Sequence, residues 1–129
     1  MDEIDKKDNI DNKIPIKAIL IGESLVGKTS LILRFTEDRF ENYSFATVGV
    51  ISNEKILKIN GKNIKYQIWD TAGQEKFRGM GKRFYTNANI GILVYDITKN
   101  KTFKEIQKYW YQELIENSPK DIGNFLYMI

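Results

Sequence analysis

The segment from Gly22 to Thr29 constrains the fold of this 129-residue chain more than any other feature. It reads GESLVGKT and matches the pattern G-x-x-x-x-G-K-[ST]. A short apolar run, residues 15–21, precedes it, and the apolar residues between Lys28 and Phe35 recur at helical spacing. A glycine-rich turn between a buried strand and a helix predicts an α/β fold with a binding site where the strand ends.

The chemistry of this segment suits phosphate. Its glycines let the main chain pass close to phosphate oxygens, successive N–H groups form a concave anion site, and the helix adds its positive N-terminal end. Lys28 is expected to reach the β and γ phosphates, and the Thr29 hydroxyl to bind Mg²⁺. An ordinary turn with a surface lysine is the alternative, and the flanking elements disfavour it. The residues expected to line the site are Gly22, Ser24, Leu25, Val26, Gly27, Lys28, Thr29 and Ser30.

A second motif, Asp70–Glu75 (DTAGQE), follows an apolar run that ends at Trp69. A carboxylate at the end of a strand lies where open α/β sheets bind ligands, so Asp70 is expected to meet the Mg²⁺ held by Thr29. Gly73 allows its N–H group close to a γ phosphate, and the Gln74 amide can orient an attacking water. The motif D-x-x-G is common in turns, and only its place in this chain makes it informative.

Residues 37–47 are predicted to form a long surface loop. Thr47, at its end, could bind Mg²⁺ through its hydroxyl or carbonyl oxygen, or could simply be a β-branched residue entering a strand. Phe40 could stack on a nucleotide base or pack on the core. The sequence leaves both alternatives open.

The middle of the chain predicts a β-hairpin. Two β-like runs, Lys55–Ile59 and Ile64–Trp69, flank Asn60-Gly61, the strongest short hairpin signal. Asn89–Asp96 is a further buried-strand pattern.

The C-terminal part of the chain predicts a helix and a strand. Thr102–Glu105 fits a capping box that opens a helix, and Pro119 follows its expected end. Trp69 and Trp110 are expected to be packing residues, and Phe125–Ile129 reads as a new strand. The lysines expected on a solvated helix face are Lys99, Lys101, Lys104 and Lys108.

Composition removes several function classes. The chain has no Cys and no His, which excludes disulfides, thiolate metal sites and imidazole bases. The net charge of +3 comes from mixed charges, which gives little reason to expect nucleic-acid binding. Residues 1–13 are mostly polar and contain no apolar stretch suited to a signal peptide. We therefore expect a flexible N-terminal tail and a cytoplasmic protein.

The chain resembles the small GTPases of the Ras superfamily, and within them the Rab branch. The resemblance rests on Gly22–Thr29 (GESLVGKT), Thr47-Val-Gly49, Trp69–Phe77 (WDTAGQEKF), Phe84–Ala88 (FYTNA) and Leu93–Thr98 (LVYDIT). It implies a three-layer P-loop NTPase fold with a mostly parallel sheet and an antiparallel hairpin of the second and third strands. It also implies binding of GTP and GDP.

The resemblance further implies roles for single residues. Mg²⁺ would be held by Thr29, Thr47 and Asp70, with Phe40 flanking the guanine. Hydrolysis of GTP would be slow, because a partner usually supplies the arginine that neutralises the developing charge.

Catalytic roles would fall to Gln74 and Lys28. Residues 37–50 and 71–83 would be switches that bind effectors, exchange factors and GTPase-activating proteins in vesicle-mediated transport.

The base-recognition motif N-K-x-D of this family is not found. Asn12-Lys13 and Asn100-Lys101 occur, but Pro15 and Phe103 stand where Asp is required. We therefore expect a monomeric chain with a tail, residues 1–13, and a partial G domain, residues 14–129, truncated within the fifth strand and lacking the prenylated cysteines of Rab proteins. Two functions stay open: a GTP-hydrolysing switch, or a truncated, inactive fragment that acts as a protein-interaction module.

Overall fold

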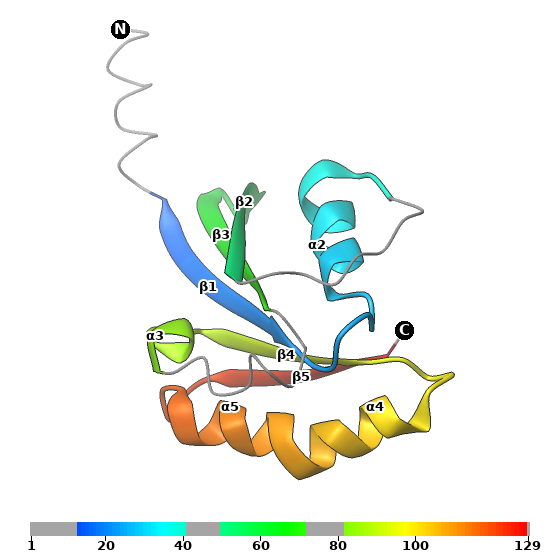
Figure 1. Ribbon diagram of the computed structural model, residues 1–129. Helices are drawn as coiled ribbons and strands as arrows, with labels where there is room; N and C mark the ends of the chain where they lie inside the picture. The colour runs from blue at the N-terminus through cyan, green and yellow to red at the C-terminus, as the bar shows by residue number, and fades with distance from the viewer. Residues whose placement is uncertain (1–12, 41–49, 72–81, 129) are drawn as a thin grey trace, which may run out of the picture.

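The computed structural model describes residues 13–40, 50–71 and 82–128 (Figure 1). A π-helical segment, Ile106–Trp110, joins two helices into one continuous helix, residues 100–117, which we call the α4–α5 helix. The elements are β1 (Ile14–Ile21), α2 (Lys28–Glu37), β2 (Val50–Ile59), β3 (Lys62–Thr71), α3 (Lys82–Tyr85), β4 (Ile90–Tyr95), α4 (Asn100–Glu105), α5 (Tyr111–Asn117) and β5 (Gly123–Met128).

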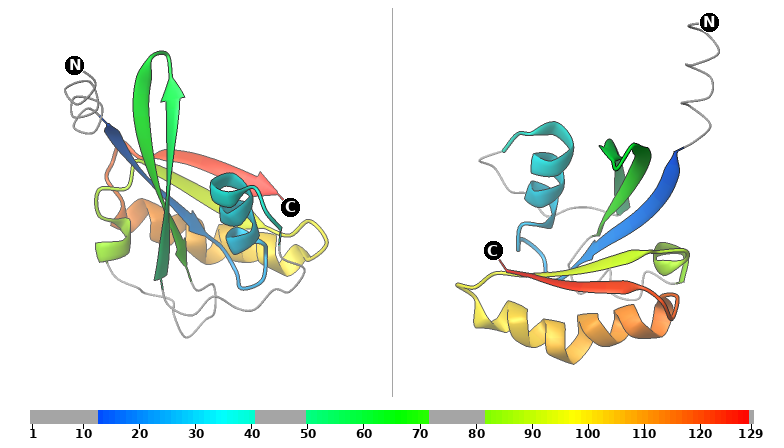
Figure 2. Two further views of the ribbon diagram at one scale, coloured as in Figure 1. Left: turned by 90° about the horizontal axis from the view of Figure 1, so that it is seen from above. Right: turned by 180° about the vertical axis from the view of Figure 1, so that it is seen from behind.

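The described strands form one sheet in the order β2-β3-β1-β4-β5. β1 pairs in parallel with β3 and β4, β4 pairs in parallel with β5, and β2 pairs antiparallel with β3. The α4–α5 helix lies along one face of β4 and β5, and α2 lies on the opposite side of the sheet (Figure 1, Figure 2). The predicted three-layer α/β fold, with its antiparallel hairpin and a strand in the last residues, is confirmed.

The core lies on both faces of β1. Ile19 and Ile21 belong to one buried cluster with Trp110 and Leu114 of the α4–α5 helix, whereas Leu20 belongs to a second cluster on the α2 side. Successive side chains of a strand point to opposite faces, so a strand covered on both sides needs a nearly continuous apolar run. This is why residues 15–21 read as a buried strand.

The hairpin turn has the predicted form. Asn60 and Gly61 have φ values of 51° and 77°, and Ile59 pairs with Lys62, so two left-handed residues close the hairpin. This is the geometry that matches the right-handed twist of paired strands. β2 and β3 are both longer than the apolar runs predicted, because main-chain pairing continues through polar residues as far as Val50 and Thr71.

The predicted capping box is wrong. α4 begins at Asn100, with Lys99 as its N-cap, and Thr102 lies within the first turn with only 7% of its surface exposed. The Thr102 hydroxyl donates to the Lys99 carbonyl at 2.7 Å and accepts from the Asp96 N–H at 3.0 Å. Thr102 therefore ties the helix to the end of β4 instead of capping it, and a local motif cannot anticipate this tertiary bond.

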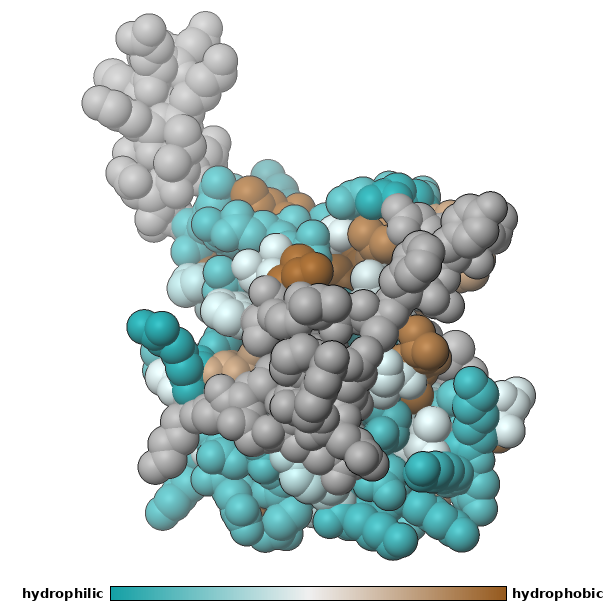
Figure 3. All heavy atoms as spheres, viewed as in Figure 1, coloured by the Kyte–Doolittle hydropathy of each residue, from teal (hydrophilic) through white to brown (hydrophobic). Residues whose placement is uncertain are grey.

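The outer surface of the α4–α5 helix is hydrophilic (Figure 3). The four lysines at 99, 101, 104 and 108 are exposed, as predicted. Its inner side packs so closely on the sheet that a Cβ on Gly91 would lie 2.8 Å from the methyl carbons of Leu114. In the described part of the chain, no helix combines the length and apolar character needed to cross a membrane.

Candidate functional site

The loop between β1 and α2 lies at the edge of the sheet where the parallel strands end (Figure 1). It starts at Gly22, whose φ of 152° is one that side-chain-bearing residues rarely adopt. A Cβ at this position would lie 2.2 Å from the carbonyl oxygen of Val94 in β4. Because that oxygen belongs to the main chain of a central strand, only glycine fits here.

The middle of the loop alternates in handedness and in burial. Leu25 and Gly27 have positive φ values of 62° and 104°, and Val26 lies between them. Such alternation turns successive N–H groups toward one side, as in an anion nest. The Val26 side chain is 3% exposed and anchors the loop in the α2-side core, whereas Leu25 is 54% exposed. Ser24 and Ser30 are half-buried.

Lys28, the first residue of α2, folds back over this loop. Its Nζ donates to the carbonyl oxygens of Gly22 at 3.1 Å and Glu23 at 2.6 Å, and the residue is 5% exposed. Burial lowers the pKa of the Lys28 ammonium from 10.5 to about 8, while the negative charges of Asp70 and Glu23 act to raise it. A buried cation held on main-chain carbonyls is well placed to donate to an anion in the loop.

Thr29 and Asp70 connect the two predicted motifs. The Thr29 hydroxyl, at the start of α2, donates to Oδ2 of Asp70, at the end of β3, over 2.5 Å. Asp70 is 1% exposed. Hydroxyl and carboxylate oxygens are ligands that Mg²⁺ accepts, and such sites commonly complete their coordination with phosphate oxygens and water. Within the described ranges no three acidic, His or Cys side chains cluster, so a Mg²⁺ ion here would depend on such external ligands.

Other predicted site residues fall elsewhere. Phe40 follows α2 and is 61% exposed, so its ring is accessible. Thr47, Gly73 and Gln74 lie outside the described residues, and their roles stay predictions.

Comparison with known proteins decides the family. The Ras family matches residues 17–128 of this chain. The chain belongs to the Ras family. It is similar to the Ras-related protein RABA5b of Arabidopsis thaliana, with 44% identity over 109 residues, and to Rab-13 of Mesocricetus auratus, with 46% over 110. Rab7 of Drosophila melanogaster is 40% identical over 114 residues.

These relatives are longer proteins. The matches cover 84%, 85% and 88% of this chain but 50%, 54% and 55% of RABA5b, Rab-13 and Rab7. The chain therefore spans about half the length of the curated relatives it matches. The match includes the loop that follows β1, β3 with Asp70, and the α4–α5 helix.

One contact of the Ras-family loop is invisible in its sequence. The indole Nε1 of Trp110, which is fully buried in the π-helical segment, donates to Oε1 of Glu23 at 2.9 Å. Glu23 is also the residue whose carbonyl holds the Lys28 ammonium. Trp110 therefore acts on the lysine through Glu23, beyond its predicted role in packing. The two residues are 87 positions apart, so no local pattern could pair them.

The lowered pKa of Lys28 predicts a pH dependence of stability. Between pH 8 and about 9.5, the folded chain releases a proton that Lys28 keeps in the unfolded chain, so stability should rise with pH. Relative to Lys28→Met, we expect a gain of about 1.5 kcal/mol in the free energy of unfolding, measured by urea denaturation. Burial raises the pKa of Tyr85, whose effect would begin above this window. Parallel pH profiles of the two proteins would contradict the buried ammonium.

The bond between Trp110 and Glu23 predicts an energetic coupling. Trp110→Phe keeps an aromatic ring but removes the N–H donor, and Glu23→Ala removes the acceptor. In a double-mutant cycle measured by urea denaturation, we expect the two losses to be non-additive by about 1–2 kcal/mol. The matched control is a cycle of Trp69→Phe with Glu23→Ala, which should show no coupling. Additive losses in both cycles would reduce Trp110 to a packing residue.

Proposed function

We propose that this chain binds GTP and GDP with Mg²⁺ and works as a Rab-like molecular switch. The observation that carries the proposal is the Thr29–Asp70 hydrogen bond of 2.5 Å, made beside the buried ammonium of Lys28. It places a cation donor, a hydroxyl and a carboxylate at one end of the sheet, next to the tightly packed Gly22. These are the groups that P-loop nucleotide sites use.

The proposed assignment gives each group one task. Main-chain N–H groups from Ser24 to Ser30 bind phosphate oxygens, and Lys28 donates to the β and γ phosphates. Thr29 and Asp70 hold Mg²⁺ together with Thr47, and Phe40 flanks the base. Mg²⁺, when bound, neutralises charge on the phosphate oxygens.

For hydrolysis, we assign Gln74 to orient the attacking water and Lys28 to stabilise the charge that develops on the phosphates. The reaction is slow in this proposal, since the described residues place no arginine at the loop and a partner would have to supply one. Gly73 would donate its N–H to the γ phosphate. Loss of this phosphate would then release residues 37–50 and 71–83 from their bound arrangement.

The wider role follows from the relatives. Similarity to Rab proteins supports a switch in vesicle-mediated transport, with effectors, exchange factors and GTPase-activating proteins as partners. In domain terms, residues 14–129 would be a G-domain portion preceded by a tail, residues 1–13. Asn100 and Lys101 begin helix α4, so they do not serve as the family's base-recognition loop.

Nucleotide binding is the decisive measurement. We expect the full chain to bind MgGDP and MgGTP more tightly than MgATP in calorimetric or fluorescent-nucleotide titrations. Lys28→Met and Gly22→Ala should abolish binding, because the first removes the buried cation and the second forces a Cβ onto a main-chain oxygen. Affinity should fall by up to about tenfold per pH unit above pH 8, since Lys28 must be protonated to bind phosphate.

The control variant is Lys108→Met, which removes an exposed lysine on the α4–α5 helix. It should bind as the unmodified chain does. Equal weak binding of all three nucleotides would contradict guanine selectivity. No binding at all would leave the protein-interaction module as the function of this chain.

The role of Gln74 has a separate test. Replacing the amide by an apolar side chain of similar size, Gln74→Leu, should lower the rate of GTP hydrolysis by about tenfold or more without weakening MgGTP binding. Single-turnover measurements of phosphate release give the rate directly. An unchanged rate would show that another group orients the water.

A further inference from the structure

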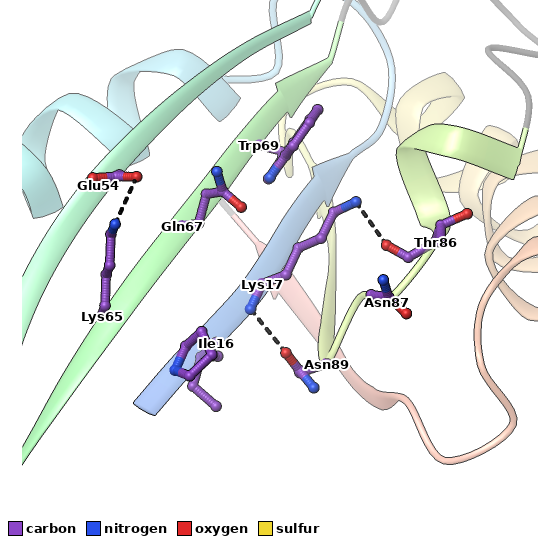
Figure 4. Close-up of a pocket in the computed structure, with 10 residues that line it drawn as sticks. Ile16, Lys17, Glu54, Lys65, Gln67, Trp69, Thr86, Asn87 and Asn89 are labelled. Carbon is purple, nitrogen blue, oxygen red and sulfur yellow. Dashed lines mark hydrogen bonds and ion pairs between the residues drawn. The ribbon is translucent and has the colours of Figure 1, made fainter. Parts of the chain in front are cut away.

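A cavity of about 510 Å³ opens on the sheet at a distance from the phosphate loop (Figure 4). Polar side chains from β1, β3 and the segment before β4 line it, among them Lys17, Lys65, Gln67, Trp69, Asn87 and Asn89. Lys17 precedes Gly22 by five residues, which is about 16 Å along a strand. The cavity is therefore separate from the candidate nucleotide site.

The position of the cavity follows from strand alternation. Lys17 shares its face of β1 with Ile19 and Ile21, which the α4–α5 helix covers. That helix runs under β4 and β5, whereas Lys17 lies nearer the start of β1 and beside β3 (Figure 1, Figure 4). This part of the face is thus left hollow, and a charged residue occupies it.

Lys17 is a cation without an anionic partner in the described ranges. Its Nζ donates to the carbonyl oxygens of Thr86 at 2.8 Å and Arg83 at 3.5 Å, and it lies 4.4 Å from the centre of the Trp69 ring. No carboxylate among the described residues lies within ion-pair distance of it. An ammonium has three N–H donors, so at least one is available to a ligand.

Trp69 supplies a second donor at the same place. Its indole Nε1 is buried and finds no hydrogen-bond acceptor among the described residues. In Figure 4 the nitrogen-bearing side of the indole is turned toward Gln67 and Lys17. A buried N–H group without an acceptor is unfavourable, and an acceptor brought by a ligand would remove that penalty.

The charges around the cavity select the kind of anion. Lys65 is already paired with Glu54 at 3.3 Å across the hairpin, which leaves Lys17 as the uncompensated cation. A dianionic phosphate would be opposed by Glu54 and matched by one lysine only. A carboxylate carries a single charge and presents two acceptor oxygens, one for each available donor.

We propose that this cavity binds a carboxylate, carried by an aspartate or glutamate side chain of a protein partner. One carboxylate oxygen accepts from Lys17 Nζ and the other from Trp69 Nε1. Pro15 and Ile16, which also line the cavity, offer apolar contact to the residues flanking that acid. The proposal does not depend on nucleotide binding, because none of these residues belongs to the phosphate loop.

The two tryptophans of the chain provide the test. A ¹⁵N-labelled sample of the full chain has one indole N–H resonance from each, and Trp69→Phe identifies that of Trp69. The probe is the capped peptide acetyl-Gly-Leu-Asp-Leu-Gly-amide, and its Asn counterpart is the neutral control. We expect the Asp peptide to shift the Trp69 resonance in a saturable way and to leave that of Trp110, which also reports the intact core, in place.

Variants separate the lysines. Lys17→Met should weaken binding of the Asp peptide by about tenfold or more, because a charge-assisted hydrogen bond is lost. Lys17→Arg should restore much of the affinity. Lys65→Met is the matched control from the same cavity and should change the affinity less than about threefold, since Lys65 is already paired.

Two further probes identify the source of the carboxylate. Sodium 3-methylbutanoate tests a free acid, and inorganic phosphate tests another anion. Binding of the peptide in preference to the free acid supports a protein partner, whereas preference for the free acid overturns that part of the proposal. Equal binding of the Asn peptide, tighter binding of phosphate, equal losses in Lys17→Met and Lys65→Met, or a Trp69 resonance that no carboxylate moves would overturn the site itself.

Discussion

The parallel pairing of β1 with both β3 and β4 is the constraint on which the candidate site depends. Parallel strands end at the same edge of a sheet, so the loop that follows β1 meets the carboxylate that ends β3. Ile19 pairs with Trp69, and three residues further on Gly22 packs against the main chain of β4. The Thr29–Asp70 contact is a consequence of this register, and a slip by one residue would point Asp70 to the other face.

The loop also holds a charge that folding alone does not favour. Lys28 loses water when it is buried, and carbonyl oxygens, Glu23 and Asp70 only partly replace it. Groups with perturbed ionisation concentrate at functional sites, where a ligand rather than the fold completes their surroundings. The bond from Trp110 to Glu23 extends this arrangement to the α4–α5 helix, so the hydrophobic core supports the position of the lysine.

The two faces of the sheet differ in how they are covered. The α4–α5 helix buries Ile19, Ile21 and Leu93 on one face, and further toward β3 the same face opens into the cavity around Lys17 and Trp69. On the other face, α2 covers Leu20 and Ile68. The strong twist of the sheet separates the ends of this surface, because β1 and β3 turn away from the direction of β4 and β5 (Figure 2).

The sequence by itself determined the element types, the α/β class and the loop from Gly22 to Thr29. These features are local: strand alternation, helical spacing, the Asn60-Gly61 turn and the glycines act within a few neighbouring residues. The family resemblance rested on the same local motifs. The capping box at Thr102 failed for the converse reason, since its hydroxyl bonds the end of a strand that comes earlier in the chain.

Only the tertiary structure decided which distant groups share a site. The pairs Thr29–Asp70, Glu23–Trp110 and Lys17–Trp69 join residues 41, 87 and 52 positions apart in sequence. Their contacts depend on strand order and on the packing of the α4–α5 helix, which a single sequence does not encode in any short pattern. For the same reason the lowered pKa of Lys28 and the open donor of Trp69 became visible only in three dimensions, because burial depends on what the rest of the chain places around a side chain.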